Sequence, residues 1–244
     1  MPAPPILLLL PGLLCDARLW RDQAAALGAT TRCIVADLTL DDNLASMAAR
    51  ALDAVPTGAP IALAGLSMGG YVAMEILRRA PARIARLALM DTSARADTPE
   101  QSRRRRGLLA LSNSGQFRGV TPRLLPMLLH PARLDGPLGD EVREMAECVG
   151  RDAFQRQQRA ILARPDSRAH LPAIRIPTLV AVGEADILTP PDLAEEIAAL
   201  IPGATLARIP DAAHLPPMET PGAVLRLLRA WLADQAAGPH SACI

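Results

Sequence analysis

The sequence of 244 residues contains no lysine: all 26 of its basic residues are arginines, and 25 residues are acidic. The formal net charge is only +1, which gives no electrostatic reason to expect nucleic acid or an anionic membrane as a partner. Aromatic residues make up 2% of the chain. A binding pocket is therefore expected to be lined mainly by aliphatic side chains and methionine.

Cysteines and long apolar runs are scarce as well. No cysteine takes part in a C-x-x-C pair or a metal-ligand spacing, which argues against a disulfide framework and a zinc site. No run of about 18 apolar residues is present, so no membrane span is expected. The N-terminal stretch that contains the apolar run Ile6–Leu10 has neither the basic region nor the cleavage site of a signal peptide. We interpret this run as a buried strand. We expect a reduced, cytoplasmic protein. The four cysteines are Cys15, Cys33, Cys148 and Cys243.

Short apolar runs recur along the chain, and each is followed by a helical pattern. Uniformly apolar runs of this length are typical of strands that are buried on both faces of a parallel sheet. The β-α alternation predicts a three-layer α/β domain with right-handed crossovers. We expect strands at 6–10, 33–36, 61–64, 87–90, 178–182 and 205–209, and helices near 19–28, 43–54, 69–80, 190–200 and 220–235.

Residues 94–171 interrupt this alternation. They contain several helical stretches and no convincing strand, and they are far too long for a loop inside a compact domain. We therefore expect a core built from residues 1–93 and 172–235, with 94–171 inserted as a helical cap over the mouth of a site. Residues 236–244 have lost the pattern and are predicted to form a flexible tail.

The motif G-x-S-x-G occurs as Gly65-Leu66-Ser67-Met68-Gly69, at a junction between a predicted strand and a predicted helix. This is the context that a nucleophile elbow requires, in which strained dihedrals push the serine hydroxyl out of the sheet edge. Glycines at 65 and 69 avoid collisions with the neighbouring strand or helix. The N–H of Met68 then points the same way as the hydroxyl, at the start of a helix whose dipole favours negative charge. Alone, the motif also fits an ordinary turn with a capping serine.

A serine hydroxyl is a poor nucleophile without a base, so a histidine is needed further along the chain. His214 follows the last predicted strand, and loops that leave the carboxyl ends of parallel strands converge on one edge of the sheet. Ser67 is expected at the same edge. His130 and His170 lie in or beside the insertion, and His240 lies in the tail.

The histidine in turn needs a carboxylate that orients it and stabilises its charged form. Asp186 follows the fifth predicted strand and Asp91 the fourth, so both leave a strand at its carboxyl end. Asp186 is favoured because its strand adjoins the one that delivers His214. The chain order then becomes Ser67, Asp186, His214, which is the order found in one class of hydrolases.

A second donor to an oxyanion is expected in the loop after the first strand. Gly12 lets the backbone turn tightly, so that the N–H of Leu13 can face the same space as that of Met68. An ordinary Pro-Gly turn that ends a strand is the alternative for this loop when it is taken alone.

These segments together resemble the α/β-hydrolase superfamily, and within it the small bacterial carboxylesterases and enol-lactonases similar to 3-oxoadipate enol-lactonase. The segments GLSMGG at 65–70, PTLVAVGEADILTPPDLAEEIAALIPGA at 177–204 and IPDAAHLPPMETP at 209–221 look like the nucleophile, acid and histidine segments of these enzymes. The segment GRDAFQRQQRAILARPDSRAHL at 150–171 looks like the end of their helical cap.

The chain departs from the family pattern in two places. The usual His-Gly of the oxyanion loop is Pro11-Gly12 here, which keeps the backbone donor of Leu13 and removes a side chain. The two antiparallel strands that usually open the fold are missing, so we expect six parallel strands and an inserted cap.

The expected function is hydrolysis of a small carboxylic ester or lactone through an acyl-enzyme, with no need for a metal or an organic cofactor. A thioesterase, a C–C bond hydrolase, a lyase or a perhydrolase that uses the same site, and a non-catalytic sensor that retains the triad, remain open. So do the substrate, the leaving group and the oligomeric state. Arg103–Arg106 fit either an anionic substrate or a solvated helix, and Gln157 and Gln158 either a pocket or a surface.

Overall fold

A computed structural model of the chain describes residues 5–115 and 117–233, and the predicted tail at 236–244 lies outside them. The described strands form a six-stranded sheet in the order β2-β1-β3-β4-β5-β6, and every neighbouring pair is parallel. The prediction of a six-stranded parallel sheet is confirmed. The strands are β1 (Ile6–Leu10), β2 (Cys33–Val35), β3 (Ile61–Leu66), β4 (Ile84–Met90), β5 (Thr178–Gly183) and β6 (Thr205–Ile209).

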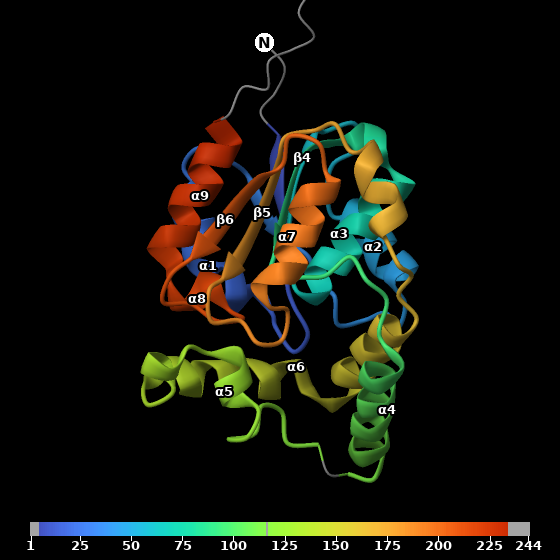
Figure 1. Cartoon of the computed structure of the whole chain (residues 1–244), viewed down its shortest axis with the longest axis vertical. Coiled ribbons are helices and arrows are strands. Elements are labelled where there is room, and N and C mark those ends of the chain that lie inside the picture. The colour runs from blue at the N-terminus through green and yellow to red at the C-terminus, as the bar shows by residue number, and fades with distance from the viewer. Residues whose placement is uncertain (1–4, 116, 234–244) are drawn as a thin grey trace, which may run out of the picture.

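Helices cover both faces of the sheet, so the core has three layers (Figure 1). One face carries α1 (Arg21–Leu27) and α9 (Pro221–Ala233), and the other carries α2 (Leu44–Asp53), α3 (Met68–Arg79) and α7 (Pro191–Leu200). All five lie where the sequence predicted helices, with ends that differ by a few residues. Helix α1 is preceded by a 3-10 turn, η1 (Ala17–Trp20).

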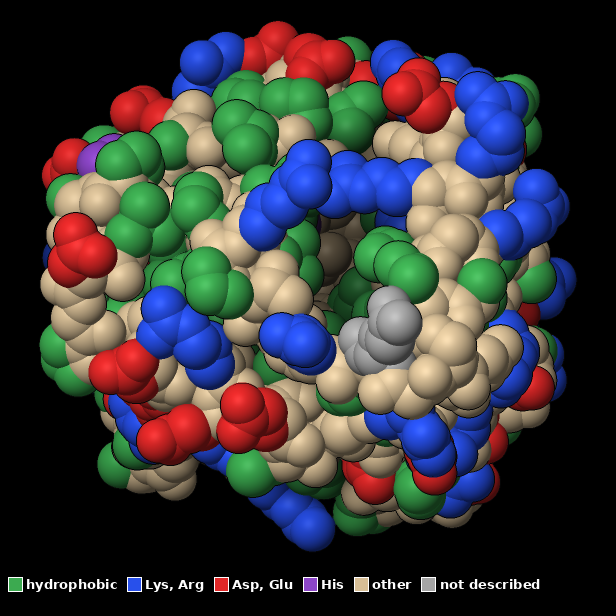
Figure 2. Space-filling model, turned by 90° about the horizontal axis from the view of Figure 1, so that it is seen from below, with side chains coloured by type: hydrophobic (Ala, Val, Ile, Leu, Met, Phe, Trp, Pro, Cys, Tyr) green, Lys and Arg blue, Asp and Glu red, His purple; other side chains and the backbone are tan. Residues whose placement is uncertain are grey.

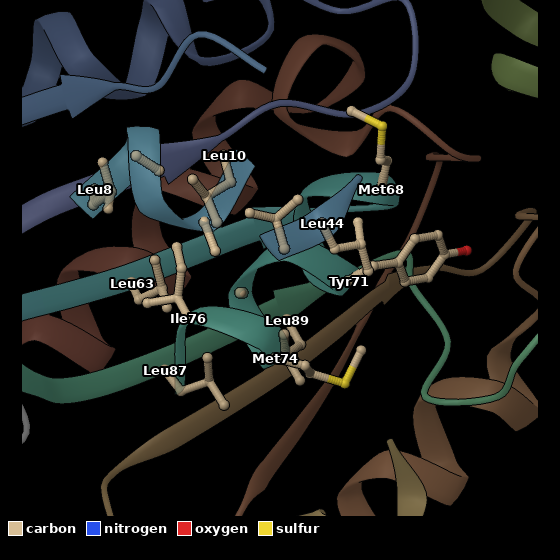
Figure 3. Close-up of a cluster of buried hydrophobic side chains, with 14 of the residues drawn as sticks. Leu8, Leu10, Leu44, Leu63, Met68, Tyr71, Met74, Ile76, Leu87 and Leu89 are labelled. Atoms are coloured by element: carbon tan, nitrogen blue, oxygen red, sulfur yellow. The ribbon is translucent and has the colours of Figure 1, made fainter. Parts of the chain in front are cut away.

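The apolar runs are explained by burial on both faces of the strands. In β1, Leu8 and Leu10 pack on the face covered by α2, α3 and α7, as Figure 3 shows, whereas Leu7 and Leu9 pack on the opposite face. All four are 0% exposed. Since successive strand side chains point to opposite faces, a strand covered on both sides needs apolar residues at every position.

The segment between β4 and β5 is helical, and the described part of it contains no strand. Figure 1 shows its long helices gathered at one end of the molecule, the end toward which the strands run. None of the helices in the described part of the chain is long and apolar enough to cross a bilayer. The helices of this segment are α4 (Pro99–Asn113), α5 (Leu125–Leu128), η3 (Pro131–Arg133), α6 (Pro137–Leu162) and η4 (Arg168–Ala173).

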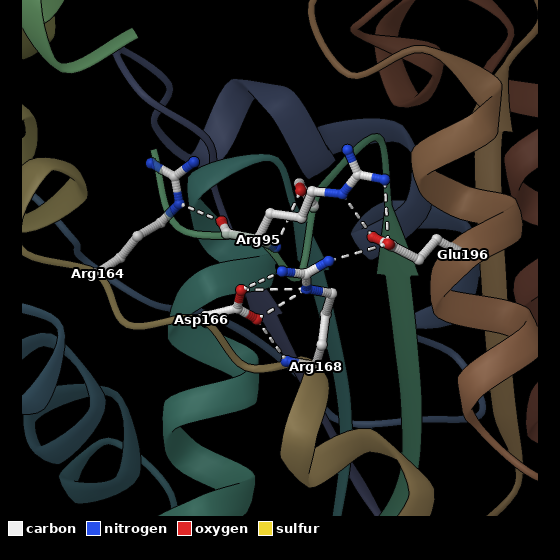
Figure 4. Close-up of polar contacts among 6 residues, drawn as sticks. Arg95, Arg164, Asp166, Arg168 and Glu196 are labelled. Atoms are coloured by element: carbon white, nitrogen blue, oxygen red, sulfur yellow. Dashed lines mark hydrogen bonds and ion pairs between the residues drawn. The ribbon is translucent and has the colours of Figure 1, made fainter. Parts of the chain in front are cut away.

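The helical segment enters and leaves the core side by side. The N–H of Ser167 donates to the carbonyl of Ala94 at 2.8 Å, and Nε of Arg164 donates to the carbonyl of Arg95 at 3.0 Å (Figure 4). The guanidinium of Arg164 also pairs with Asp97, and both side chains are almost fully buried. A buried pair of this kind is costly to break from one side, because the remaining charge loses its partner.

Exposed ion pairs surround this junction. Arg95 and Arg168 both contact Glu196 of α7, and Arg168 also pairs with Asp166 (Figure 4). Each such pair contributes little alone, since exposed charges are screened by water and salt. They nevertheless join the end of the helical segment to the core.

Candidate active site

Ser67 lies in a sharp turn between β3 and α3, with φ 54° and ψ −115°, which is rarely adopted by a residue other than glycine. The glycines two positions away make the turn possible. A Cβ on Gly69 would lie 2.2 Å from the carbonyl oxygen of Leu10, and one on Gly65 would lie 2.3 Å from that of Gly69. The hydroxyl of Thr92 donates to the carbonyl of Ser67 at 2.8 Å and fixes the turn from β4.

His214 lies between the hydroxyl of Ser67 and the carboxylate of Asp186. Its Nε2 is 2.9 Å from Oγ of Ser67, and its Nδ1 is 2.8 Å from Oδ2 of Asp186. The three residues come from the loops after β3, β5 and β6. Ser67 and His214, the two that are furthest apart in sequence, are separated by 147 positions. His214 and Asp186 are buried, while Ser67 is half-buried and can be reached from solvent.

The carboxylate of Asp186 is held in its charged form. Burial alone would raise its pKa, but the positive charge that His214 carries when it is protonated, and hydrogen bonds from His214 and Thr189, outweigh burial and lower it. Thr189 contributes its hydroxyl at 2.7 Å and its N–H at 3.1 Å. An ionised carboxylate can only accept, so Nδ1 of His214 carries the proton and Nε2 offers its lone pair to the hydroxyl of Ser67.

Asp91, the other candidate for the orienting carboxylate, lies beside Asp186 and His214 and has different partners. Its Oδ1 accepts the N–H of Gly183 at 2.8 Å, and its Oδ2 has no hydrogen-bond partner among the described residues. Complete burial, and then the negative charge of Asp186, raise the pKa of Asp91 well above its usual value. The pKa values of these two neighbouring carboxyl groups are thus displaced in opposite directions, that of Asp91 upward and that of Asp186 downward.

Asp91, Asp186 and His214 are also the described residues whose geometry comes nearest to a metal site, with one ligand atom from each within 4.8 Å of the others. Two of these atoms already share a hydrogen bond, and Oδ1 of Asp91 accepts the N–H of Gly183. The chemistry of the three groups thus suits a hydrogen-bond network better than a cation.

The loop after β1 passes directly beside the elbow. A Cβ on Gly12 would lie only 3.4 Å from that of Ser67. Within 5–115 and 117–233, the N–H groups of Leu13 and Met68 have no hydrogen-bond partner in the protein. The protein itself thus engages neither of the two amides that the sequence predicted as oxyanion donors.

The helical segment supports this loop through Gln157, a residue whose place the sequence left open. Gln157 is 0% exposed. Its Oε1 accepts the N–H of Leu14 at 3.1 Å, and its Nε2 donates to the carbonyl of Leu38 at 3.2 Å. Leu14 has φ 59°, so the hydrogen bond holds a strained residue next to Leu13. Gln158 is buried as well and accepts from Arg105 at 3.0 Å.

Two further side chains hold Asp186 and the backbone around His214 and were missed from the sequence, namely Thr189 and Glu219. Glu219 accepts backbone N–H groups from both neighbours of His214. Burial raises the pKa of Glu219, and the N–H groups that it accepts offset part of this effect. The only available signal was its place five residues after the histidine, which does not reveal that the side chain folds back.

Other candidate groups lie elsewhere. Burial, and then the charge of Asp16, raise the pKa of the Cys15 thiol to about 12, so it does not compete as a nucleophile. His170 lines a largely apolar cavity of about 330 Å³ between α3 and η4 that none of the three triad residues touches. Among Arg103–Arg106, Arg105 pairs with Asp97.

Viewed from the end that carries α4, α5 and α6, the molecule is hollowed (Figure 2). Hydrophobic side chains lie inside the hollow, and arginine side chains cross its rim. One contact between the helices of this end joins Nη2 of Arg104 in α4 to the sulfur of Met127 in α5 at 3.6 Å.

Residues 7–227 match the model of the Alpha/beta hydrolase family. The chain belongs to this family. The predictions of the superfamily and of a hydrolase are therefore confirmed. The chain is 31% identical over 164 residues to the pimeloyl-[acyl-carrier protein] methyl ester esterase of Neisseria meningitidis. That match covers 65% of this chain and 63% of the relative, so it spans less than two thirds of the relative's length.

Solved structures agree with this assignment. A thermophilic esterase from Thermogutta terrifontis, with malate bound, is 31% identical, with a TM-score of 0.84 over 95% of this chain and 90% of that one. The enol-lactonase of Burkholderia xenovorans is 24% identical, with a TM-score of 0.82 over 95% of this chain and 92% of that one. At 24% identity the second likeness shows the fold alone.

Proposed function

We propose that the protein is a serine hydrolase that cleaves a small carboxylic ester or lactone through an acyl-enzyme. The observation that carries the proposal is the continuous chain of hydrogen bonds from the hydroxyl of Ser67, through the imidazole of His214, to the carboxylate of Asp186, at 2.9 and 2.8 Å. A hydroxyl, a base and an orienting carboxylate in this order are what nucleophilic acyl transfer requires.

In the first half of the reaction, Nε2 of His214 takes the proton of Ser67 as its Oγ attacks the carbonyl carbon. The negative charge that develops on the carbonyl oxygen is stabilised by the N–H groups of Leu13 and Met68, the latter at the start of α3. The imidazolium formed is stabilised by Asp186. Collapse of the tetrahedral intermediate expels the alcohol, which takes its proton from Nε2, and leaves an acylated serine.

In the second half, water takes the place of the alcohol. Nε2 of His214 removes a proton from water as its oxygen attacks the acyl carbonyl, and the same two amides hold the oxyanion. The ester bond to Ser67 then breaks, the serine oxygen recovers the proton from Nε2, and the acid leaves. Each half of the reaction ends with the imidazole back in the tautomer that Asp186 favours.

The helical segment 94–171 acts in this proposal as a cap that shapes the pocket. It meets the core at the end to which the strands run, and Gln157 ties it to the loop of Leu13. The hollow in Figure 2 is the proposed way in, and its hydrophobic interior favours aliphatic acyl groups. Support for an ester as substrate comes from two relatives named esterases, each 31% identical to this chain.

The decisive experiment replaces Ser67 by alanine and measures turnover of p-nitrophenyl acetate and butyrate, lactones and thioesters. We expect kcat to fall by about a thousandfold or more, because the nucleophile is lost while the oxyanion donors remain. Circular dichroism and the melting temperature serve as the control for folding. A Ser67→Ala variant that keeps even about a tenth of the wild-type turnover would rule the mechanism out.

The alternatives give different outcomes with the wild-type protein. A burst of one nitrophenolate per chain followed by steady turnover supports the hydrolase, whereas labelling of Ser67 without turnover supports a sensor. Product analysis distinguishes hydrolysis from C–C cleavage, lyase and perhydrolase reactions at the same site.

A further inference from the structure

A buried carboxylate that the reaction does not use holds the loop that carries His214. Glu219, the last residue of α8 (Pro216–Glu219), is 5% exposed. Its Oε1 accepts the N–H of Ala213 at 2.8 Å and the N–H of Leu215 at 3.1 Å. Since these residues precede and follow His214, one oxygen atom fixes the backbone on both sides of the imidazole.

The other oxygen of Glu219 faces the helical segment. Its Oε2 accepts the N–H of His130, which follows α5, at 2.6 Å. We call residues 128–133 the bracing segment and residues 211–219 the histidine loop. Two more hydrogen bonds join them, from the His214 N–H to the Leu128 carbonyl at 3.1 Å and from Arg133 to the Asp211 carbonyl at 2.6 Å.

We propose that Glu219 is a positioning residue for His214, and that through it the bracing segment determines how well the imidazole is aimed at Ser67. The kinetic part of this proposal rests on the proposed function. Nε2 has to stay within hydrogen-bond distance of the reacting oxygen in both halves of the reaction. A displacement of about 1 Å in such a geometry costs on the order of a hundredfold in rate.

The contacts explain why a carboxylate occupies this position. All three partners of Glu219 are N–H donors, so both side-chain oxygens have to accept. A glutamine of the same size has one oxygen and one NH2 group, which can only donate. Whichever way its amide turned, a donor would face either the pair Ala213 and Leu215 or the N–H of His130.

The first experiment compares Glu219→Gln with Glu184→Gln. Glu184 is an exposed carboxylate on the same rim, two residues before Asp186, so it controls for the loss of a charge. We expect Glu219→Gln to lower kcat on a p-nitrophenyl ester by about tenfold or more while KM changes by less than about threefold. Glu184→Gln should match the wild type.

A readout that needs no turnover accompanies the kinetics. We expect the proton between Nδ1 of His214 and Asp186 to give a downfield resonance in the proton NMR spectrum of the resting protein, because the hydrogen bond is short and buried. We expect this resonance to shift or broaden in Glu219→Gln and to stay unchanged in Glu184→Gln. A residue that only stabilised the fold would lower the melting temperature and leave the resonance of the folded protein in place.

The second experiment perturbs the bracing segment without changing Glu219. His130 has φ −56° and Leu129 before it has φ −119° and ψ 146°, so a proline fits the backbone at position 130. His130→Pro removes the N–H and places ring carbon where the proton pointed, which displaces Oε2. His130→Ala removes the imidazole and keeps the N–H. We expect the proline variant alone to lower kcat and to disturb the NMR resonance.

The outcomes separate this proposal from the proposed function. Wild-type protein without turnover of any ester would remove the hydrolase assignment, while the resonance of Glu219→Gln would still decide the role of Glu219. An unchanged kcat and resonance in Glu219→Gln would overturn the positioning role. Equal behaviour of His130→Pro and His130→Ala would overturn the link to the bracing segment.

Discussion

The elbow of Ser67 and the histidine loop meet at one hydrogen bond, yet they are built in different ways. The elbow is built within the core, where Gly65 and Gly69 are in contact with each other and Thr92 holds the carbonyl of Ser67. The histidine loop takes its partners from far along the chain: Asp186 is 28 residues away from His214, and His130 is 89 residues away from Glu219.

The core therefore determines the position of the nucleophile, whereas the helical segment can alter the position of the base. The sheet and α3 hold the nucleophile, and the atoms nearest to a Cβ placed on Gly65 or Gly69 all belong to the core. The base is instead held by the loop after β5 and by the bracing segment, so its alignment depends on how the helical segment is seated.

The largest expected effect comes from the base side of the site. Asp186→Asn should lower kcat by about ten thousandfold, because an amide neither favours the correct tautomer of His214 nor stabilises its charge. Asp91→Asn should change kcat by less than about threefold, since the side-chain oxygen of asparagine can still accept the N–H of Gly183. Steady-state kinetics on one ester compare the two, and equal losses would mean that the two aspartates share the role.

The second prediction concerns how much the glycines of the elbow contribute to the stability of the fold. Gly69→Ala should destabilise the fold by about 3 kcal/mol or more, because a Cβ placed 2.2 Å from the Leu10 carbonyl oxygen forces β1 and α3 apart. Gly107→Ala is the matched control. Gly107 lies inside α4, where an added Cβ would meet nothing within 4 Å beyond the backbone of its own helix, so alanine should stabilise by about 0.5–1 kcal/mol. Urea unfolding measures both. A tolerated Gly69→Ala would mean that the elbow is less closely packed than the structure shows.

The smallest effect, taken per pH unit, is a dependence of stability on pH. The pKa of Asp91 is higher in the folded chain than its ordinary value of 3.8, so above that pH the folded state keeps a proton that the unfolded state loses. This lowers the wild-type stability as pH rises, by at most about 1.4 kcal/mol per pH unit, until the folded pKa is passed. Asp91→Asn lacks this contribution. Its melting temperature relative to wild type should therefore increase from pH 4 to pH 7, and a constant difference would contradict a raised pKa.

The sequence was most informative where the structure is locally determined. The six strands could be predicted because strands covered on both faces are apolar at every position, and the elbow could be found because two glycines at fixed spacing have a steric cause. The placement of Asp186 next to His214 followed from strand order. The supporting residues could not be found in this way, since Glu219 and Gln157 act through side chains that reach backbone groups distant in sequence.

The junction at Ala94 and Ser167 has a consequence for how such a chain can diversify. Two chain ends that lie one hydrogen bond apart allow the segment between them to be exchanged for another without opening the sheet. A transplanted segment would still have to supply a backbone N–H that donates to the carboxylate of Glu219 and a side-chain oxygen that accepts the N–H of Leu14. Exchanges that lack these two groups would give a folded protein with an impaired catalyst.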